Sequence, residues 1–189
     1  VTEIGLHAFS NCESLHTIKF PEKLLTIRSD AFSCCEKLTT IELPSTLSVI
    51  EDGAFSCCES LQTVHFECSN LSIGEFAFDS CTSIKDITFS KRKKSTDALH
   101  IGVCAFSNCE SIKTLTLPKT LCFLGDSCFE SCKSLESVEI PGTVEILPRD
   151  IFTGCSSLSR IKIGDGIRVI HSFGNCKRAK LCLPRNRLL

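Results

Sequence analysis

The residues of this 189-residue chain that could bind a metal, form disulfides or act as nucleophiles are fifteen cysteines and five histidines. Eight of the cysteines recur at a regular spacing: Cys12, Cys35, Cys58, Cys81, Cys109, Cys132, Cys155 and Cys176. Zinc sites usually contain close pairs of ligands, but the chain has no C-x-x-C pair. The histidines likewise show no H-x-x-x-H spacing; they are His7, His16, His65, His100 and His171. The sequence therefore predicts no metal site.

Motifs that carry catalysis are also missing from the sequence. There is no G-x-S-x-G, no glycine-rich phosphate loop, no H-E-x-x-H and no cysteine–histidine pair at a meaningful spacing. Glutamates recur at one repeated position, as template residues on a surface do: Glu13, Glu36, Glu59 and Glu110. Catalysis needs unique residues gathered in a concave site. We therefore predict no catalytic and no cofactor-binding residues, and a protein that is not an enzyme.

Composition and charge exclude several partners. The formal net charge of −1 provides no global field for nucleic acid or an anionic membrane. No run of eighteen apolar residues exists, so membrane insertion is not expected. Met, Trp and Tyr are absent while Phe is abundant, which indicates one template copied many times. The chain begins with Val1, shows no signal peptide, and is expected to be an excised piece or a processed product.

The elements that hold these cysteines are copies of one repeat. A phenylalanine stands three residues before each cysteine of the regular series, at Phe9, Phe32, Phe55, Phe78, Phe106, Phe129, Phe152 and Phe173. The interval is 23 residues except at one five-residue insertion and before the last copy, which comes two residues early. Apolar residues recur six, nine, eleven and eighteen positions after the phenylalanine. These matching columns predict stacked coils, because one short coil cannot bury its own apolar face.

Alternation of apolar and polar residues in "TTIEL" (39–43) and "ESVEI" (136–140) is typical of short strands. Prolines close several of these strands, since proline has no N–H to continue a ladder. The next segment (45–55) is expected to be an extended return arm followed by a tight turn or short 3₁₀ piece. The fold class predicted is a repeat solenoid with a parallel sheet, one short strand per coil, about eight coils and little regular helix. Residues 1–189 are expected to form a single domain.

The pattern L-x-x-I-x-L-P-x-x-L-x-x-I-x-x-x-A-F-x-x-C resembles the leucine-rich repeats of the BspA-like family, also called Treponema-type repeats. The segment "LTTIELPSTLSVIEDGAFSCC" (38–58) is a near-consensus copy. The resemblance implies a leucine-rich repeat solenoid from a cell-surface or extracellular protein. It is less specific for function, because the matching positions are core positions. The asparagine ladder of common leucine-rich repeats is missing, and the cysteines occupy another column.

The regular cysteines have two structural interpretations. Free cysteine often acts as a small buried apolar residue, and this column is expected to lie in the core. Neighbouring coils would also place the Cα atoms within the range of a disulfide, although parallel side chains would strain the bond. Among the other cysteines, Cys34 and Cys57 share a turn-like column with Asn11, Ser80, Asn108, Ser131 and Gly154. They are expected to be exposed.

Two columns of outward side chains on the predicted strands form what we call the polar strand face. Its fourteen residues are Thr17, Lys19, Thr40, Glu42, Thr63, His65, Asp86, Thr88, Thr114, Thr116, Ser137, Glu139, Arg160 and Lys162. Leucine-rich folds usually bind partners with this surface, so these residues are the candidate partner-binding site. A merely soluble sheet face remains the alternative, since threonine suits exposed strands and neither column contains an aromatic anchor.

The insertion falls within residues 90–100 and contains four consecutive cations, Lys91, Arg92, Lys93 and Lys94. It is expected either to contact an anionic surface or to be a solvated loop. The last coil (171–189) is degenerate and basic, which suits a terminal coil that meets water. The first strand edge has no such cap. We expect that further repeats precede Val1 or that this edge mediates end-to-end self-association.

Three functional hypotheses follow. The first is a non-enzymatic binding and adhesion module of a cell-surface protein, contacting a protein or glycan ligand on another cell, a host or the matrix. The second is an intracellular leucine-rich repeat scaffold or regulatory protein with reduced thiols. The third is a structural spacer.

Overall fold

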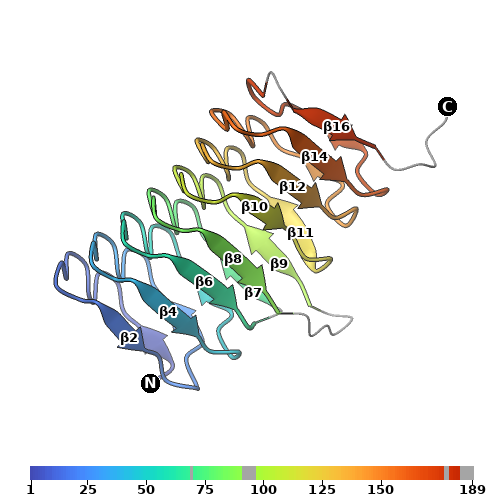
Figure 1. Ribbon diagram of the computed structural model, residues 1–189. Helices are drawn as coiled ribbons and strands as arrows, with labels where there is room; N and C mark the ends of the chain where they lie inside the picture. Colours follow the sequence, from blue (N-terminus) through green and yellow to red (C-terminus); the bar gives the residue numbers. More distant parts are fainter. Residues whose placement is uncertain (69, 91–96, 177–178, 184–189) are drawn as a thin grey trace.

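The computed structural model of the chain describes residues 1–68, 70–90, 97–176 and 179–183. Within these ranges every regular element is a short β-strand, and no helix is present. The chain winds into successive coils that stack from the N-terminus to the C-terminus (Figure 1). The predicted repeat solenoid is therefore confirmed, with little regular helix as expected.

Each coil contributes strands to two parallel sheets, which we call the front and back sheets. The front strands are β2 (Thr17–Lys19), β4 (Thr40–Leu43), β6 (Thr63–Phe66), β8 (Asp86–Phe89), β10 (Thr114–Thr116), β12 (Ser137–Ile140), β14 (Arg160–Ile163) and β16 (Lys180–Cys182). The back strands are β1 (Glu3–Ile4), β3 (Thr26–Ile27), β5 (Val49–Ile50), β7 (Leu71–Ile73), β9 (Leu99–Ile101), β11 (Leu121–Leu124), β13 (Ile146–Leu147) and β15 (Val169–Ile170). The front sheet is the predicted one. The extended return arm supplies the back sheet, which the sequence did not predict.

The repeat columns stack in register. Ile41 of β4 pairs with Val64 of β6, and Ile27 of β3 pairs with Ile50 of β5, as identical repeat positions should. In β4 the alternation is direct, because Ile41 and Leu43 are buried while Thr40 and Glu42 are exposed. Apolar and polar residues alternate within each strand, and the stacking of coils in register places like residues side by side. The result is a set of continuous apolar and polar ladders along the sheet.

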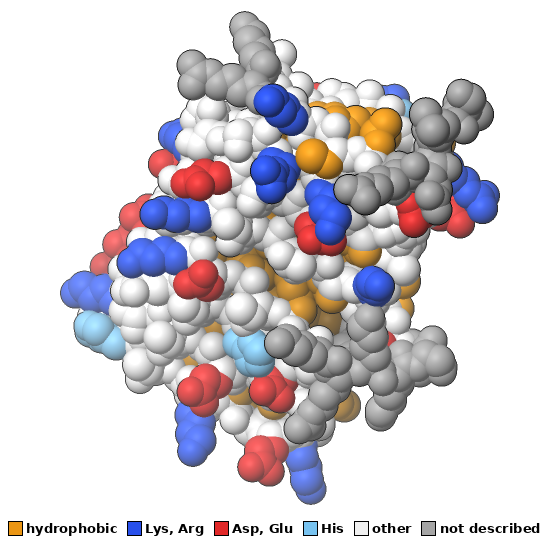
Figure 2. Space-filling model, turned by 45° about the vertical axis from the view of Figure 1, so that its right-hand side comes forward, with side chains coloured by type: hydrophobic (Ala, Val, Ile, Leu, Met, Phe, Trp, Pro, Cys, Tyr) orange, Lys and Arg blue, Asp and Glu red, His pale blue; other side chains and the backbone are white. Residues whose placement is uncertain are grey.

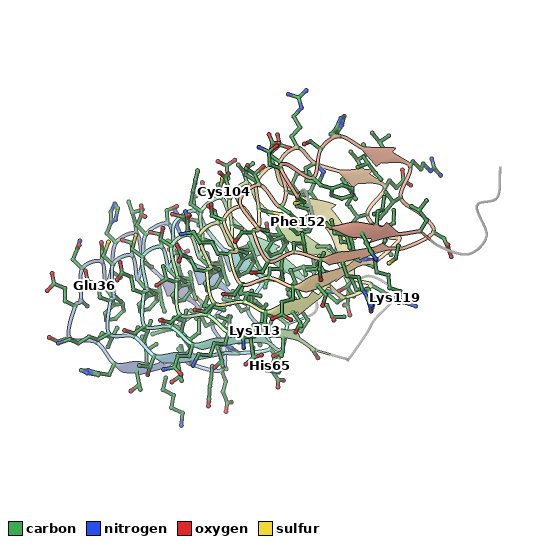
Figure 3. The ribbon with its side chains drawn as sticks, turned by 45° about the horizontal axis from the view of Figure 1, so that its top comes forward. Glu36, His65, Cys104, Lys113, Lys119 and Phe152 are labelled. Atoms are coloured by element: carbon green, nitrogen blue, oxygen red, sulfur yellow. The ribbon has the colours of Figure 1, made fainter. Side chains whose placement is uncertain are left out.

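The phenylalanine column forms the centre of the core. Rings of neighbouring coils lie face to face, with centroids 5.1 Å apart and planes 5° apart for Phe32 and Phe55. Six of these side chains have no exposed surface: Phe32, Phe55, Phe78, Phe106, Phe129 and Phe152. Figure 3 shows Phe152 enclosed between the layers of the solenoid. Burying each such ring stabilises the fold by roughly 1.5–3 kcal/mol relative to leaving it exposed.

The chain reverses direction around each phenylalanine through left-handed backbone conformations. The residues two before and two after the phenylalanine have positive φ in seven coils: His7, Asn11, Asp30, Cys34, Gly53, Cys57, Phe76, Ser80, Cys104, Asn108, Ser127, Ser131, Asp150 and Gly154. Backbone bonds then join each turn to the next, such as Phe32 N–H to the Ala54 carbonyl at 2.8 Å. The expected tight turn is present, without a 3₁₀ helix in the described residues. In five coils the residue before the phenylalanine is alanine, which is small enough to permit this approach.

Each sheet is interrupted once. The front sheet divides between β8 and β10, the two strands that the insertion separates in the sequence. The back sheet divides between β11 and β13. At the corresponding position of other coils, an N–H donates to the preceding coil, as Gly125 does to the Ile101 carbonyl at 2.8 Å. In the coil that contains β13, the equivalent position holds Pro148, which has no N–H, so the ladder of backbone hydrogen bonds ends there.

Candidate functional site

The polar strand face is a surface of the front sheet, as the alternation predicts. Thirteen of its fourteen residues are exposed, and Ser137 is half-buried. Parallel register places equivalent residues beside one another, so Glu42 of β4 lies between Lys19 of β2 and His65 of β6. Figure 3 shows His65 on the opposite side of the solenoid from Cys104, which lies in a turn. The predicted residues are thus brought together on one surface, whereas their role in binding stays a prediction.

Polar contacts organise this face. The Lys162 ammonium lies 2.7 Å from a Glu139 carboxylate oxygen on the neighbouring strand. The His65 ring contacts the Thr88 hydroxyl at 2.6 Å through Nδ1 and the Glu67 carboxylate at 3.3 Å through Nε2. Each pair is exposed, and exposed ion pairs contribute less than about 1 kcal/mol. Their main effect is to hold charges of both signs at fixed positions along the face.

A hollow at the break between β8 and β10 lies in the middle of the polar strand face; we call it the central groove. Its volume is about 620 Å³. It is lined by Asp86, Ile87, Thr88, Phe89, Ser90, Thr114, Thr116, Leu117, Pro118, Lys119, Glu139 and Pro141. Figure 2 shows hydrophobic side chains gathered across the middle of the molecule, between acidic and basic ones. An apolar floor with a polar rim is the usual composition of a protein-binding patch.

Phe89 is the functional candidate in the central groove that sequence analysis missed. It belongs to a column expected to point inward, and one face of its ring stacks on Phe66 at a centroid distance of 5.3 Å. The following coil has Leu117 in this column, and Phe89 is only partly buried. The sequence feature that could have indicated this site is the 28-residue interval between phenylalanines. It shows that the insertion directly follows Phe89 and separates its strand from the next one. The polar strand face therefore has an aromatic side chain beside it, Phe89, although its two outward columns contain none.

A second hollow lies at the N-terminal end of the polar strand face. Its volume is about 670 Å³, and its lining includes Lys19, Thr40, Glu42, Thr63 and His65. The main-chain turn after β4 closes one side of it through Pro44. Phe20, Ile41 and Leu43 also contribute to its lining, so the hollow offers apolar contact as well as hydrogen bonds and ion pairs.

The back sheet also exposes apolar side chains, which the sequence did not predict. Phe123 and Ile146 are 51% and 53% exposed, and they line a hollow at the break between β11 and β13. Pro148 contributes to the same hollow. This surface lies on the other sheet from the predicted site, so it is a natural comparison surface for binding experiments.

The cysteine column lies in the core, as one of the two interpretations predicted. Six of its members are buried: Cys35, Cys58, Cys81, Cys109, Cys132 and Cys155. All fifteen cysteines are free thiols in the structure. Burial raises the pKa of Cys35 to about 12, with a further contribution from the neighbouring Cys58. A thiol so protonated is a poor nucleophile and a poor metal ligand.

Other predicted features have mixed outcomes. The described part of the chain holds no group of three or more side chains that could bind a metal ion. No helix there is long and apolar enough to cross a membrane. The four cations Lys91, Arg92, Lys93 and Lys94 lie outside the described residues, as do parts of the last coil. At the first coil, Phe9 is 37% exposed, whereas the phenylalanines of the inner coils are fully covered.

Two parallel sheets built from 23-residue coils around a phenylalanine stack define this chain as a leucine-rich repeat solenoid. A family model for the BspA type leucine rich repeat region matches residues 1–99 and 95–187, with six copies. The chain therefore belongs to the BspA-type leucine-rich repeat family, as its sequence pattern indicated.

Solved structures agree with this assignment. The leucine rich repeat protein TpLRR of T. pallidum is 27% identical over 90% of this chain and 67% of its own, with a TM-score of 0.57. The pneumococcal vaccine antigen PcpA is 24% identical over 97% of this chain, with a TM-score of 0.63, which shows a shared fold. The chain spans 56% of PcpA. A search of curated proteins finds no match.

Proposed function

We propose that this chain is a non-enzymatic binding and adhesion module of a cell-surface protein. It would contact a protein or glycan on another cell, on a host or in the matrix through the polar strand face. The surface location and the adhesive role rest on the chain's membership of the BspA-type family, whose members include surface proteins. The fold supports a role in recognition, since a stack of short strands presents a long, rigid surface.

The observation that carries this proposal is the central groove. A polar sheet face alone would be equally suited to solvent, but the lining of this groove includes Phe89, Leu117 and Pro118 among hydroxyl and charged side chains. Phe89 and Pro118 are partly exposed, whereas Leu117 is buried. Central apolar contacts surrounded by polar ones are where binding energy concentrates in protein interfaces. A partner that filled the groove would also meet Lys119 and Glu139 at its rim.

The test measures binding to an array of extracellular-matrix proteins and glycans, together with adhesion of coated beads to cultured cells. One variant, Thr116→Arg, places a long charged side chain over the central groove. A second combines Lys19→Glu, Glu42→Lys and Glu139→Lys on the polar strand face. Both are expected to lose at least tenfold in affinity for whichever probe the native chain binds, which corresponds to about 1.4 kcal/mol.

The matched control is Phe123→Ser with Ile146→Ser on the back sheet, where both side chains are exposed and their replacement should leave the core intact. This variant is expected to bind like the native chain. Loss of binding in the control with full binding in the two front-sheet variants would reject the proposed face. Full binding in all three would favour a spacer role, and a chain that binds no probe would remove the basis for an adhesive function.

A further inference from the structure

One pair of cysteines lies outside the buried column and has a different environment. Cys34 and Cys57 occupy the left-handed position two residues after the repeat phenylalanine, with φ of 57° and 56°. Both side chains are partly exposed, whereas Cys35 and Cys58 beside them in sequence are fully buried. The left-handed turn therefore sends consecutive cysteines to opposite environments, one into the core and one towards solvent.

The two partly exposed thiols belong to adjacent coils at the same repeat position. The Cys34 N–H donates to the Ser56 carbonyl at 2.8 Å, and the Cys57 N–H donates to the Asp79 carbonyl at 2.8 Å, so the turns step in register. The Phe32 and Phe55 rings lie two residues before these cysteines, and their centroids are 5.1 Å apart, which indicates the spacing between the two coils. Cysteine Cα atoms joined by a disulfide are usually separated by about 4.4–6.8 Å, and a step of this size falls within that range. The parallel side chains would strain the bond, and a strained disulfide is more easily reduced, which suits a reversible site.

Cys34 also affects the protonation of the Cys57 thiol. Burial and then the neighbouring Cys34 are the largest causes that raise the pKa of Cys57 to about 11, and Asp79 and Glu59 contribute further. Cys57 is thus mostly a neutral thiol at neutral pH, which slows its reactions without preventing them. The inner cysteines differ because their thiols donate to carbonyl oxygens inside the core, as Cys58 does to Phe32 at 3.2 Å.

We propose that Cys34 and Cys57 form a reversible redox site, in which a low-molecular-weight disulfide oxidises the two thiols to a disulfide between adjacent coils. The Cys34 thiolate attacks one sulfur of the oxidant, forms a mixed disulfide and releases the first small thiol. The Cys57 thiolate then attacks the Cys34 sulfur, which forms the bond between the coils and releases the second small thiol. Two electrons pass to the oxidant, and the two protons lost by the cysteines end on the two small thiols.

The site is particular to these two coils. The other residues at this turn position are Asn11, Ser80, Asn108, Ser131 and Gly154, so no other adjacent pair in this column carries thiols. Serine at two of these positions also shows that replacing Cys34 or Cys57 by serine suits the local backbone. Cys34 and Cys57 lie in turns outside the front strands that carry the polar strand face, so oxidation would leave the proposed binding surface free.

The experiment uses the full chain with the exposed Cys122 and Cys182 replaced by serine, which limits reactions between molecules. The probe is oxidised glutathione. After incubation, free thiols are blocked with N-ethylmaleimide, and intact mass and peptide mapping follow without reduction. The expected product has lost two hydrogen atoms and carries a cross-link between Cys34 and Cys57, while Cys35 and Cys58 remain thiols. The glutathione adduct of Cys34 should precede it, and its closure should accelerate about tenfold per pH unit between pH 7 and 9.

Variants separate this site from general thiol oxidation. Cys57→Ser should stop at the glutathione adduct, and Cys34→Ser should form no cross-link at this edge. Adding Ser80→Cys to Cys34→Ser moves the pair one coil along and should restore a cross-link between positions 57 and 80. The proposal is overturned if the native pair gives two separate glutathione adducts or two unmodified thiols, or if the cross-link involves Cys35 or Cys58. Circular dichroism of each variant verifies that the comparison is made on folded protein.

Discussion

The thiol of Cys58 donates a hydrogen bond to the carbonyl oxygen of Phe32 in the preceding coil, with Sγ and O 3.2 Å apart. The same contact recurs for Cys35 to Phe9, Cys81 to Phe55, Cys109 to Phe78, Cys132 to Phe106, Cys155 to Phe129 and Cys176 to Phe152. Cysteine suits this column because it is small enough for the core, largely apolar, and still a donor. The repeated cysteine is therefore part of the contact between coils.

Replacing Cys58 by alanine should lower the free energy of unfolding by about 1–2 kcal/mol, because the core loses a sulfur atom and the Phe32 carbonyl loses one of its donors. The measurement is chemical denaturation followed by circular dichroism. Cys122→Ala is the matched control, since that side chain is exposed, and it should change stability by less than about 0.5 kcal/mol. Equal effects at the two positions would contradict a structural role for the buried column.

The phenylalanine stack predicts a difference between inner and outer coils. Phe55 is buried between Phe32 and Phe78, with centroid distances of 5.1 and 5.2 Å, and Phe55→Ala should cost about 3–5 kcal/mol. Phe9 stacks on Phe32 alone and is 37% exposed, so Phe9→Ala should cost less than half as much. Denaturant titrations of both variants test this order. A larger loss at Phe9 would mean that the first coil limits stability.

Buried thiols predict a loss of stability in alkali. The pKa of Cys35 is raised from 9.0 to about 12, and that of Cys68 to about 11, both chiefly by burial. Because the unfolded chain loses these protons first, the stabilisation is complete below pH 9 and is lost as the pH rises towards the folded values. Each thiol lowers the free energy of unfolding by about 1.4 kcal/mol per pH unit within its window.

The measurement is the free energy of unfolding between pH 8 and 11 under reducing conditions. Cys68→Ala removes one of the buried thiols, so its stability should fall less steeply than that of the native chain between pH 9 and 11. Other groups that titrate in this range affect both proteins alike, and the difference in slope isolates Cys68. Parallel curves would show that this thiol ionises as readily in the folded state as in the unfolded one.

Sequence analysis predicted the features that repeat, and it missed features that depend on a single coil. The phenylalanine, cysteine and isoleucine columns are buried in every inner coil, so their spacing indicated the core, the front sheet and the polar strand face. The back sheet has strands of two to four residues with irregular apolar spacing, and their pairing follows from the stacking of coils. No alternation within such a short segment could have indicated it.

The candidate site depends on exceptions to the repeat. Phe89 borders a groove because an insertion follows it, and Pro148 ends the back-sheet ladder because it lacks an N–H. Each exception was visible in the sequence as an irregular interval or an unmatched residue. The opening between strands that results from each exception could not be predicted, because it depends on the relative positions of neighbouring coils.

The break at Pro148 predicts local differences in amide exchange. Val49 N–H in the intact part of the back sheet donates to the Leu25 carbonyl at 3.1 Å. Ile146 holds the same repeat position, but its strand β13 does not pair with β11. The Ile146 amide should therefore exchange with solvent at least about tenfold faster than the Val49 amide. Hydrogen exchange followed by NMR measures both, and equal protection would contradict an open edge at β13.

The first coil predicts end-to-end association of this chain. Strands β1 and β2 are the first members of their sheets, and Phe9 stacks on a ring on one side alone. Unpaired strand edges with an apolar core behind them readily pair with another chain. We expect sedimentation velocity to show a species larger than a monomer that grows with concentration.

A charged residue at this edge should abolish the association. Ile18 of β2 is half-buried against the core, and Ile18→Lys would place an ammonium group where a second coil has to stack. Arg160→Glu on β14 introduces a charge change away from the edge and serves as the control. If the native chain sediments as a monomer at all concentrations, or if Ile18→Lys associates as strongly as Arg160→Glu, the first coil is not a contact surface between copies.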